Sequence, residues 1–139
     1  MRKSSVFILF PIAAIFLLAV SCGSNSMMMS TRQLQSVAVS PSSAVMATSS
    51  NGMVQFTAMG TYTMAPMTAN LPVRWSLGSP FSTPAPTGVS IDANGVAQCS
   101  GFNGMIMVEA TSPMDPNMPV SQMSMNTMNV TGMAQLTCP

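Results

Sequence analysis

Residues 54–62 read VQFTAMGTY, and this stretch decides how the rest of the chain can fold. Its larger apolar side chains stand at every second position, namely Val54, Phe56, Ala58 and Tyr62, with Gly60 between the last two. An apolar period of two is typical of a β-strand that buries one face and exposes the other. The pattern therefore predicts a strand over residues 53–64, with Met59 on its outward face and further strands covering its apolar face.

Prolines divide the rest of the chain, because proline lacks the N–H that a central strand needs. The windows between them predict further strands at 34–40, 73–77, 89–91, 96–99, 105–111 and 129–138. Asn94-Gly95 joins two of these windows and is the strongest short signal for a β-hairpin. The last strand has an inward set if it kinks near Gly132: Val130, Ala134, Leu136 and Cys138. No window carries the 3.6-residue stripe of an amphipathic helix, so about seven short strands predict an all-β sandwich or barrel in one domain.

The same alternation assigns side chains to the core and to the surface. Five large residues are expected in the core: Phe56, Tyr62, Trp75, Ile106 and Val108. Met105, Met107 and Glu109 alternate with core positions and are expected to face solvent, as is Arg74.

The N-terminus carries the pattern of an export signal. Met1-Arg2-Lys3 is basic, and residues 6–20 form an apolar run that only Pro11 interrupts. A basic segment followed by such a run is typical of a secretory leader, whereas a transmembrane helix needs a longer run of ~20 apolar residues. Residues 1–21 are therefore predicted to be a signal peptide.

The end of this leader, Leu18-Ala19-Val20-Ser21-Cys22, resembles the lipobox of bacterial lipoproteins. The resemblance implies that Cys22 becomes the new N-terminus and carries acyl chains, which anchor the protein in membrane lipid at ~0.8 kcal/mol per buried CH₂. Residues 22–33 then form a lipidated tether that we expect to be flexible. Gly23 stands where an aspartate would favour the inner membrane, so we expect the outer membrane or the cell surface. An ordinary leader cleaved near Cys22 is the alternative.

The mature part carries few charges, and they predict neither a nucleic-acid site nor a catalytic one. Its charged residues are Arg32, Arg74, Asp92, Glu109 and Asp115. Nucleic acid is not expected as a partner, because no basic patch is present in the sequence. The chain has no histidine and no Gly-rich phosphate loop, and its carboxylates are far apart in sequence. A paired general acid and base is therefore not expected, and the sequence predicts a non-catalytic protein without a cofactor.

Several segments together resemble a bacterial immunoglobulin-like domain of group 2: Gln55-Phe56 with Gly60-Thr61-Tyr62, Trp75-Ser76, Asn94-Gly95-Val96 and the closing GMAQLTC. The resemblance covers residues 34–138 and implies an immunoglobulin-like antiparallel β-sandwich over residues 34–139. Such domains are common in surface adhesins, so the resemblance implies adhesion to, or binding of, a protein, glycan or cell-wall partner. It also places the strands of Arg74 and Glu109 side by side, which predicts an ion pair worth ~0.2–1 kcal/mol.

Two cysteines, Cys99 and Cys138, remain after acylation of Cys22. A disulfide is the default expectation for two cysteines in an exported chain. The chain-entropy model values the closure of a loop of about 40 residues at roughly 4 kcal/mol. Two free buried thiols are the alternative.

Methionine is the anomaly of the composition, with 17 residues in the chain. Outward positions are predicted for Met59, Met105, Met107 and Met133, which indicates a possible apolar surface patch for a partner. Clustered thioethers can instead bind Cu(I) or absorb oxidant reversibly, but Cu(I) sites usually add a histidine. The remaining alternatives are methionines without a specific role, and a non-catalytic subunit of an envelope complex.

Overall fold

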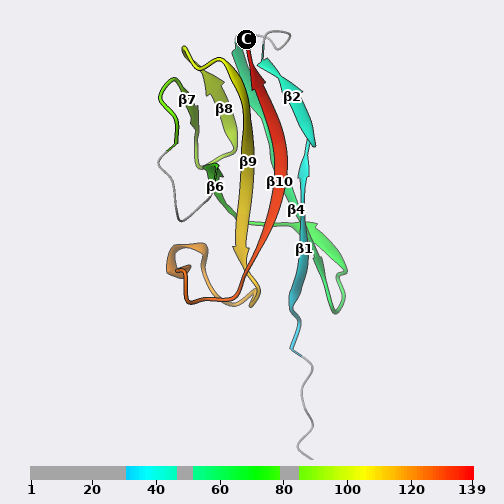
Figure 1. Ribbon diagram of the computed structural model, residues 1–139. Helices are drawn as coiled ribbons and strands as arrows, with labels where there is room; N and C mark the ends of the chain where they lie inside the picture. Colours follow the sequence, from blue (N-terminus) through cyan, green and yellow to red (C-terminus); the bar gives the residue numbers. More distant parts are fainter. Residues whose placement is uncertain (1–30, 47–51, 79–84) are drawn as a thin grey trace, which may run out of the picture.

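The computed structural model describes residues 31–46, 52–78 and 85–139 (Figure 1). These ranges include ten strands and the 3₁₀ turn η3: β1 (Leu34–Ser40), β2 (Ser43–Val45), β3 (Met53–Gln55), β4 (Thr57–Tyr62), β5 (Thr68–Asn70), β6 (Arg74–Leu77), β7 (Val89–Ile91), β8 (Val96–Cys99), β9 (Gly104–Pro113), η3 (Val120–Gln122) and β10 (Asn129–Cys138). The described part of the chain contains no α-helix, which confirms the all-β prediction.

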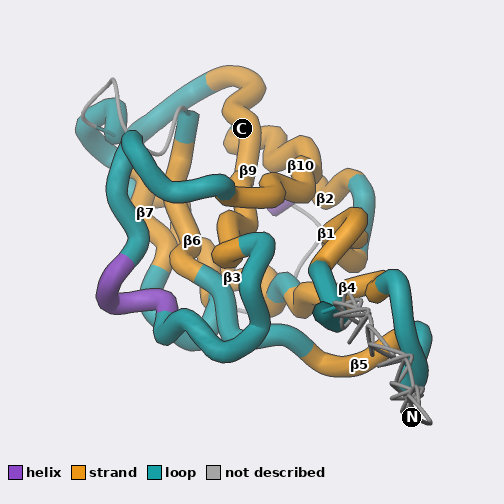
Figure 2. Tube along the Cα trace, turned by 90° about the horizontal axis from the view of Figure 1, so that it is seen from below, coloured by secondary structure: helices purple, strands orange, loops and turns teal. Residues whose placement is uncertain are grey.

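The strands form a sandwich of two layers with open edges. One layer is the four-stranded sheet β2-β10-β9-β6, and the other consists of the three-stranded sheets β1-β4-β5 and β3-β8-β7. Figure 2 looks along the strands and shows β10 and β2 on one side of the domain, with β4 and β5 on the other. The pairing is antiparallel, as expected, except in one place, where β2 pairs with β10 in parallel. This pairing follows from Pro41, which ends β1 and lets the chain cross to the other layer.

The strand expected over residues 53–64 is divided in two at Phe56. Its first part, β3, pairs with β8, and its second part, β4, pairs with β1 and β5. Between them the Phe56 N–H donates to the carbonyl of Gly95, in the β7–β8 turn, at 2.8 Å. Apolar alternation continues through the break, so the sequence pattern could not reveal the change of partner. This division and the two additional short strands β2 and β5 raise the number of strands from about seven to ten.

The core lies between the layers and receives side chains from both. Phe56 and Val108 are fully buried, and Tyr62 is nearly so. Trp75 and Ile106 are partly buried and pack against the central cluster. The rings of Phe56 and Trp75 lie 6.4 Å apart between centroids, tilted at 45°, a separation within the range of favourable aromatic pairs.

The last strand, β10, holds the two layers in close contact. It pairs with β9 without a shift of register from Asn129 to Cys138, so its inward side chains need no kink near Gly132. A Cβ at Gly132 would collide with the carbonyl of Val37 in β1. Glycine is therefore needed here because the β1 backbone crosses β10 at close range.

The predicted leader, Cys22 and most of the tether lie outside the described residues, which begin with Thr31. Within the described ranges, no helix has the length and apolar character required to span a bilayer.

Candidate functional site

The described residues contain no group of three or more His, Cys, Asp or Glu side chains that could hold a metal ion. Four other features of the described residues bear on function: the disulfide, the exposed methionines, one buried carboxylate and the end at which the chain enters the sandwich.

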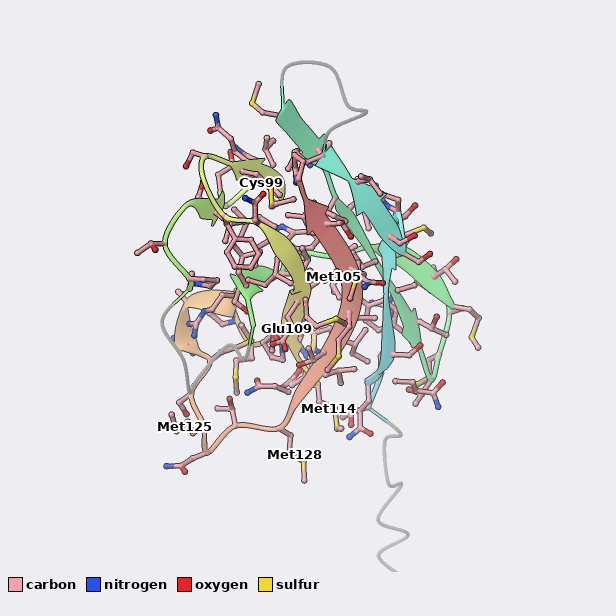
Figure 3. The ribbon with its side chains drawn as sticks, turned by 45° about the horizontal axis from the view of Figure 1, so that its top comes forward. Cys99, Met105, Glu109, Met114, Met125 and Met128 are labelled. Atoms are coloured by element: carbon pink, nitrogen blue, oxygen red, sulfur yellow. A yellow bond between two sulfur atoms is a disulfide. The ribbon has the colours of Figure 1, made fainter. Side chains whose placement is uncertain are left out.

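The predicted disulfide is present between Cys99 and Cys138, with their Cα atoms 6.0 Å apart. Cys99 ends β8 in one layer, and Cys138 ends β10 in the other. The bond therefore links the two layers covalently near one end of the domain, where Figure 3 places Cys99. Neither sulfur is available as a thiol nucleophile or as a thiolate ligand in this state.

Methionine dominates the exposed apolar surface. Among the described residues, every large hydrophobic side chain that is exposed is a methionine, except Val45. Met105 and Met107 lie two residues apart on the outward face of β9, and Met133 lies on the same face of neighbouring β10. The amide of Gln135 donates a hydrogen bond to the Met105 sulfur at 2.7 Å. We call Met105, Met107 and Met133 the sheet-face patch.

Met59 does not belong to this patch. It projects outward from β4, between the buried residues Ala58 and Gly60, in the opposite layer of the sandwich. The sequence correctly gave all four methionines an outward position, and their exposed fractions range from 41 to 69%. Alternation within a strand does not tell which layer the strand joins, so the sequence could not separate Met59 from the other three.

Glu109 faces outward from β9 but is only 7% exposed. The strand register places Ser76 of β6 on one side of it and Met133 of β10 on the other. In the described part of the chain, its Oε2 atom and the Ser76 hydroxyl are buried without a hydrogen-bond partner. Burial raises the pKa of the Glu109 carboxyl above its ordinary value, because desolvation disfavours the charged form. The sequence pattern gave no signal for this burial.

The structure does not support the ion pair expected between Arg74 and Glu109, because burial is the only cause of the shifted pKa of the Glu109 carboxyl. Arg74 lies opposite Thr111, whereas Glu109 lies opposite Ser76. The Arg74 guanidinium donates instead to the carbonyl of Val120 at 3.4 Å. The β9–β10 connection folds back to the start of β6 and supplies this acceptor, which a comparison of strands alone could not predict.

The β7–β8 turn is fastened by one exposed carboxylate. Asp92 Oδ1 accepts hydrogen bonds from the backbone N–H groups of Val96 and Asn94, at 2.8 and 2.9 Å. These bonds, with that of Val96 the largest cause, lower the pKa of the Asp92 carboxyl. Gly95 has φ of +86°, and a Cβ there would meet the Trp75 ring. The turn therefore supports the core by bringing Gly95 against the Trp75 ring.

The chain enters the sandwich beside the β4–β5 turn. Thr63 N–H donates to the Gln33 carbonyl, and Gln33 N–H donates to the Thr63 hydroxyl, both at 2.9 Å. The Arg32 guanidinium donates to the Pro66 carbonyl at 2.9 Å, and its central carbon lies 3.5 Å from the centroid of the Tyr62 ring. These contacts fix the last residues before β1 to this end of the domain.

The β9–β10 connection reaches the same end. Leu34 N–H donates to the carbonyl of Met114, and Met114 N–H donates to the carbonyl of Met128, both at 2.9 Å. We call the β4–β5 turn (63–67) and the β9–β10 connection (114–128) together the N-terminal pole. Figure 3 shows Met114, Met125 and Met128 at this pole, with Cys99 at the other end of the molecule.

Comparison with models of known protein families and with curated proteins gave no match.

Proposed function

We propose that this chain is an exported lipoprotein that presents one group 2 immunoglobulin-like sandwich at the cell envelope. It acts as a non-catalytic module that binds a protein, glycan or cell-wall partner. The observation that carries the proposal is the disulfide between Cys99 and Cys138, because structural disulfides persist in oxidising compartments outside the cytosol. The leader pattern of residues 1–21 supports export, and the lipobox-like segment ending at Cys22 supports anchoring in a membrane.

The first test is the mass of the mature protein. The full chain, produced in a bacterial host from its own leader, is expected in the membrane fraction with acylated Cys22 as its first residue. The matched control, Cys22→Ser, is expected to lack acyl chains, because serine offers no thiol for the lipid. A mature N-terminus at another residue, without lipid, would show that the lipoprotein assignment is wrong.

The sheet-face patch is the surface that we propose for partner binding. Its three methionines share one face of β9 and β10 and are adaptable apolar side chains. The double variant Met105→Lys/Met133→Lys is expected to reduce partner capture from envelope extracts at least tenfold. Met59→Lys is the matched control, because Met59 is 47% exposed but lies in the other layer. Equal capture by both variants would place the binding surface elsewhere.

A second candidate function, binding of Cu(I) or buffering of oxidants, is favoured by the same grouping of three thioethers on one face. A Cu(I) titration against a competing chelator tests the metal function. Tight binding should weaken when Met105, Met107 and Met133 are changed to Leu, and should persist in Met59→Leu. No binding tighter than micromolar would exclude Cu(I) as the ligand.

A further inference from the structure

The N-terminal pole carries a second group of exposed methionines, separate from the sheet-face patch. Met64 and Met67 belong to the β4–β5 turn and are 44 and 54% exposed, whereas Met125 and Met128 belong to the β9–β10 connection and are 72 and 76% exposed. Figure 3 places Met125 and Met128 at the far end of the molecule from Cys99. Because the two loops meet through Gln33, Leu34 and Met114, we treat these four residues together as the pole methionines.

The pole has few charges that would resist contact with an apolar medium. Asp115 is the only charged residue of the two loops, and its Oδ1 accepts hydrogen bonds from the backbone and side-chain amides of Asn117. The neighbouring Arg32 donates to the carbonyls of Met64 and Pro66. Both charges thus keep local partners, which lowers the cost of bringing the pole to a membrane interface.

We propose that the pole methionines insert into the interface of the bilayer that holds acylated Cys22, so that the sandwich stands on this pole with its disulfide end outward. This inference rests on the lipoprotein function proposed above. Only nine residue steps separate Cys22 from Thr31, so Thr31, next to the residues that contact the pole, lies at most ~32 Å from the acyl anchor even at full extension.

A lipid surface fits the pole better than a shaped protein partner does. Methionine is unbranched, with three rotatable side-chain bonds, and adapts to irregular surroundings. The four residues belong to two loops that are hydrogen-bonded to the chain where it enters the domain. The sheet-face patch, by contrast, lies along the side of the sandwich on β9 and β10. A flat bilayer in contact with the pole would leave that side exposed.

Oxidation by hydrogen peroxide, read by mass spectrometry, tests this orientation at single residues. The full-length, processed lipoprotein is reconstituted in vesicles of phosphatidylethanolamine and phosphatidylglycerol and pulsed with peroxide. Exposure alone predicts that the pole methionines react about as fast as Met59, Met105 and Met133, since the two groups are exposed over similar ranges. Insertion predicts sulfoxide formation at least threefold slower at the pole methionines than at those three internal controls.

A pair of variants tests whether the four pole methionines act together. Met125→Gln/Met128→Gln replaces two exposed side chains by polar ones of similar length, and should speed oxidation of Met64 and Met67 toward the rate of the controls. The matched variant, Met105→Gln/Met133→Gln, should leave the protection of the pole unchanged. An equal effect of both variants would overturn the inference.

The remaining outcomes separate this inference from the function on which it rests. An intact mass without acyl chains on Cys22 overturns both. Acylated protein whose pole methionines react at the rate of the controls overturns the orientation alone, and so does protection of Met105 and Met133 in their place. Protection that disappears when the protein-to-lipid ratio is lowered would identify a second copy as the occupant, and would also overturn it.

Discussion

The strands β9 and β10 build two faces of one sheet, and these faces differ in what determines their residues. On the inner face, Val108, Ala110, Ala134 and Leu136 are at most 2% exposed and fill the space between the layers. On the outer face, Met105, Met107 and Met133 are exposed, whereas Glu109 between them is buried. Both faces share the same backbone, the same strand register and the same disulfide. The inner face is thus set by packing against the opposite layer, whereas burial on the outer face differs from one residue to the next.

Truncating one side chain on each face should give the largest difference in the free energy of unfolding. Leu136→Ala removes a fully buried side chain and is expected to lower the free energy of unfolding by about 2–5 kcal/mol. Met133→Ala, three residues earlier on the outer face, is expected to change it by less than about 0.5 kcal/mol. Chemical denaturation with the disulfide intact measures both. Comparable losses would contradict the contrast between the faces.

A substitution at Gly132 tests how closely the backbones of β1 and β10 approach each other. A methyl group at this inward position would meet the Val37 carbonyl, so Gly132→Ala is expected to cost about 1–3 kcal/mol through forced displacement of β1. Gln135→Ala on the outer face serves as the control and is expected to have a much smaller effect. Stability equal to wild type in Gly132→Ala, measured by the same denaturation, would show that β1 can move aside.

The effect of Glu109→Gln on the free energy of unfolding tests the burial of this carboxyl on the outer face, and we expect the effect to change with pH. Burial raises the pKa of Glu109 above its ordinary value of 4.5, so the folded state binds more protons than the unfolded state in that range. Wild-type stability should therefore fall as pH rises from about 4.5 through the raised pKa. The variant has no such carboxyl and is expected to be more stable at pH 7, by an amount on the order of 1 kcal/mol. Denaturation at pH 7 and again well below pH 4.5 checks this, since the advantage should vanish at the lower pH.

The contribution of Asp92 to stability should change with pH in the opposite direction to that of Glu109. We expect it to be the smallest of these effects. Its pKa is lowered below the ordinary value of 3.8 by backbone hydrogen bonds. Its carboxylate therefore stabilises the hairpin above pH 3.8, and this contribution is lost as pH falls through the lowered pKa. Asp92→Asn keeps an oxygen acceptor but does not titrate, so its stability should lack this acid-side loss. Parallel acid profiles of the two proteins would contradict the assignment.

Local signals in the sequence predicted a large part of the fold. Prolines and period-two alternation placed strands at the observed bounds of β1, β7, β8 and β10, because both signals act within a few residues. The disulfide was predictable because the leader-like N-terminus predicts export, and two cysteines in an exported chain are expected to pair. Phe56 and Trp75, expected in the core, pack together there.

The features that the sequence missed all depend on contacts between distant segments. The division at Phe56 requires the carbonyl of Gly95, and the acceptor for Arg74 comes from Val120 in a distant loop. Burial of Glu109 and the layer that Met59 faces depend on neighbours that alternation does not specify. For the candidate site, sequence therefore found which methionines are exposed, but not how they divide between surfaces.

The disulfide also determines how this domain would respond to a mechanical load. The chain enters at one pole, and the Cys99–Cys138 bond lies near the other, bridging a sequence separation of 39 residues. A pull between the residues before β1 and the C-terminal end can lengthen only the chain that precedes Cys99, since everything from Cys99 to Cys138 stays closed as a covalent ring. The strands β9 and β10, with the methionines on their outer face, lie inside that ring, so the pulling force cannot extend them.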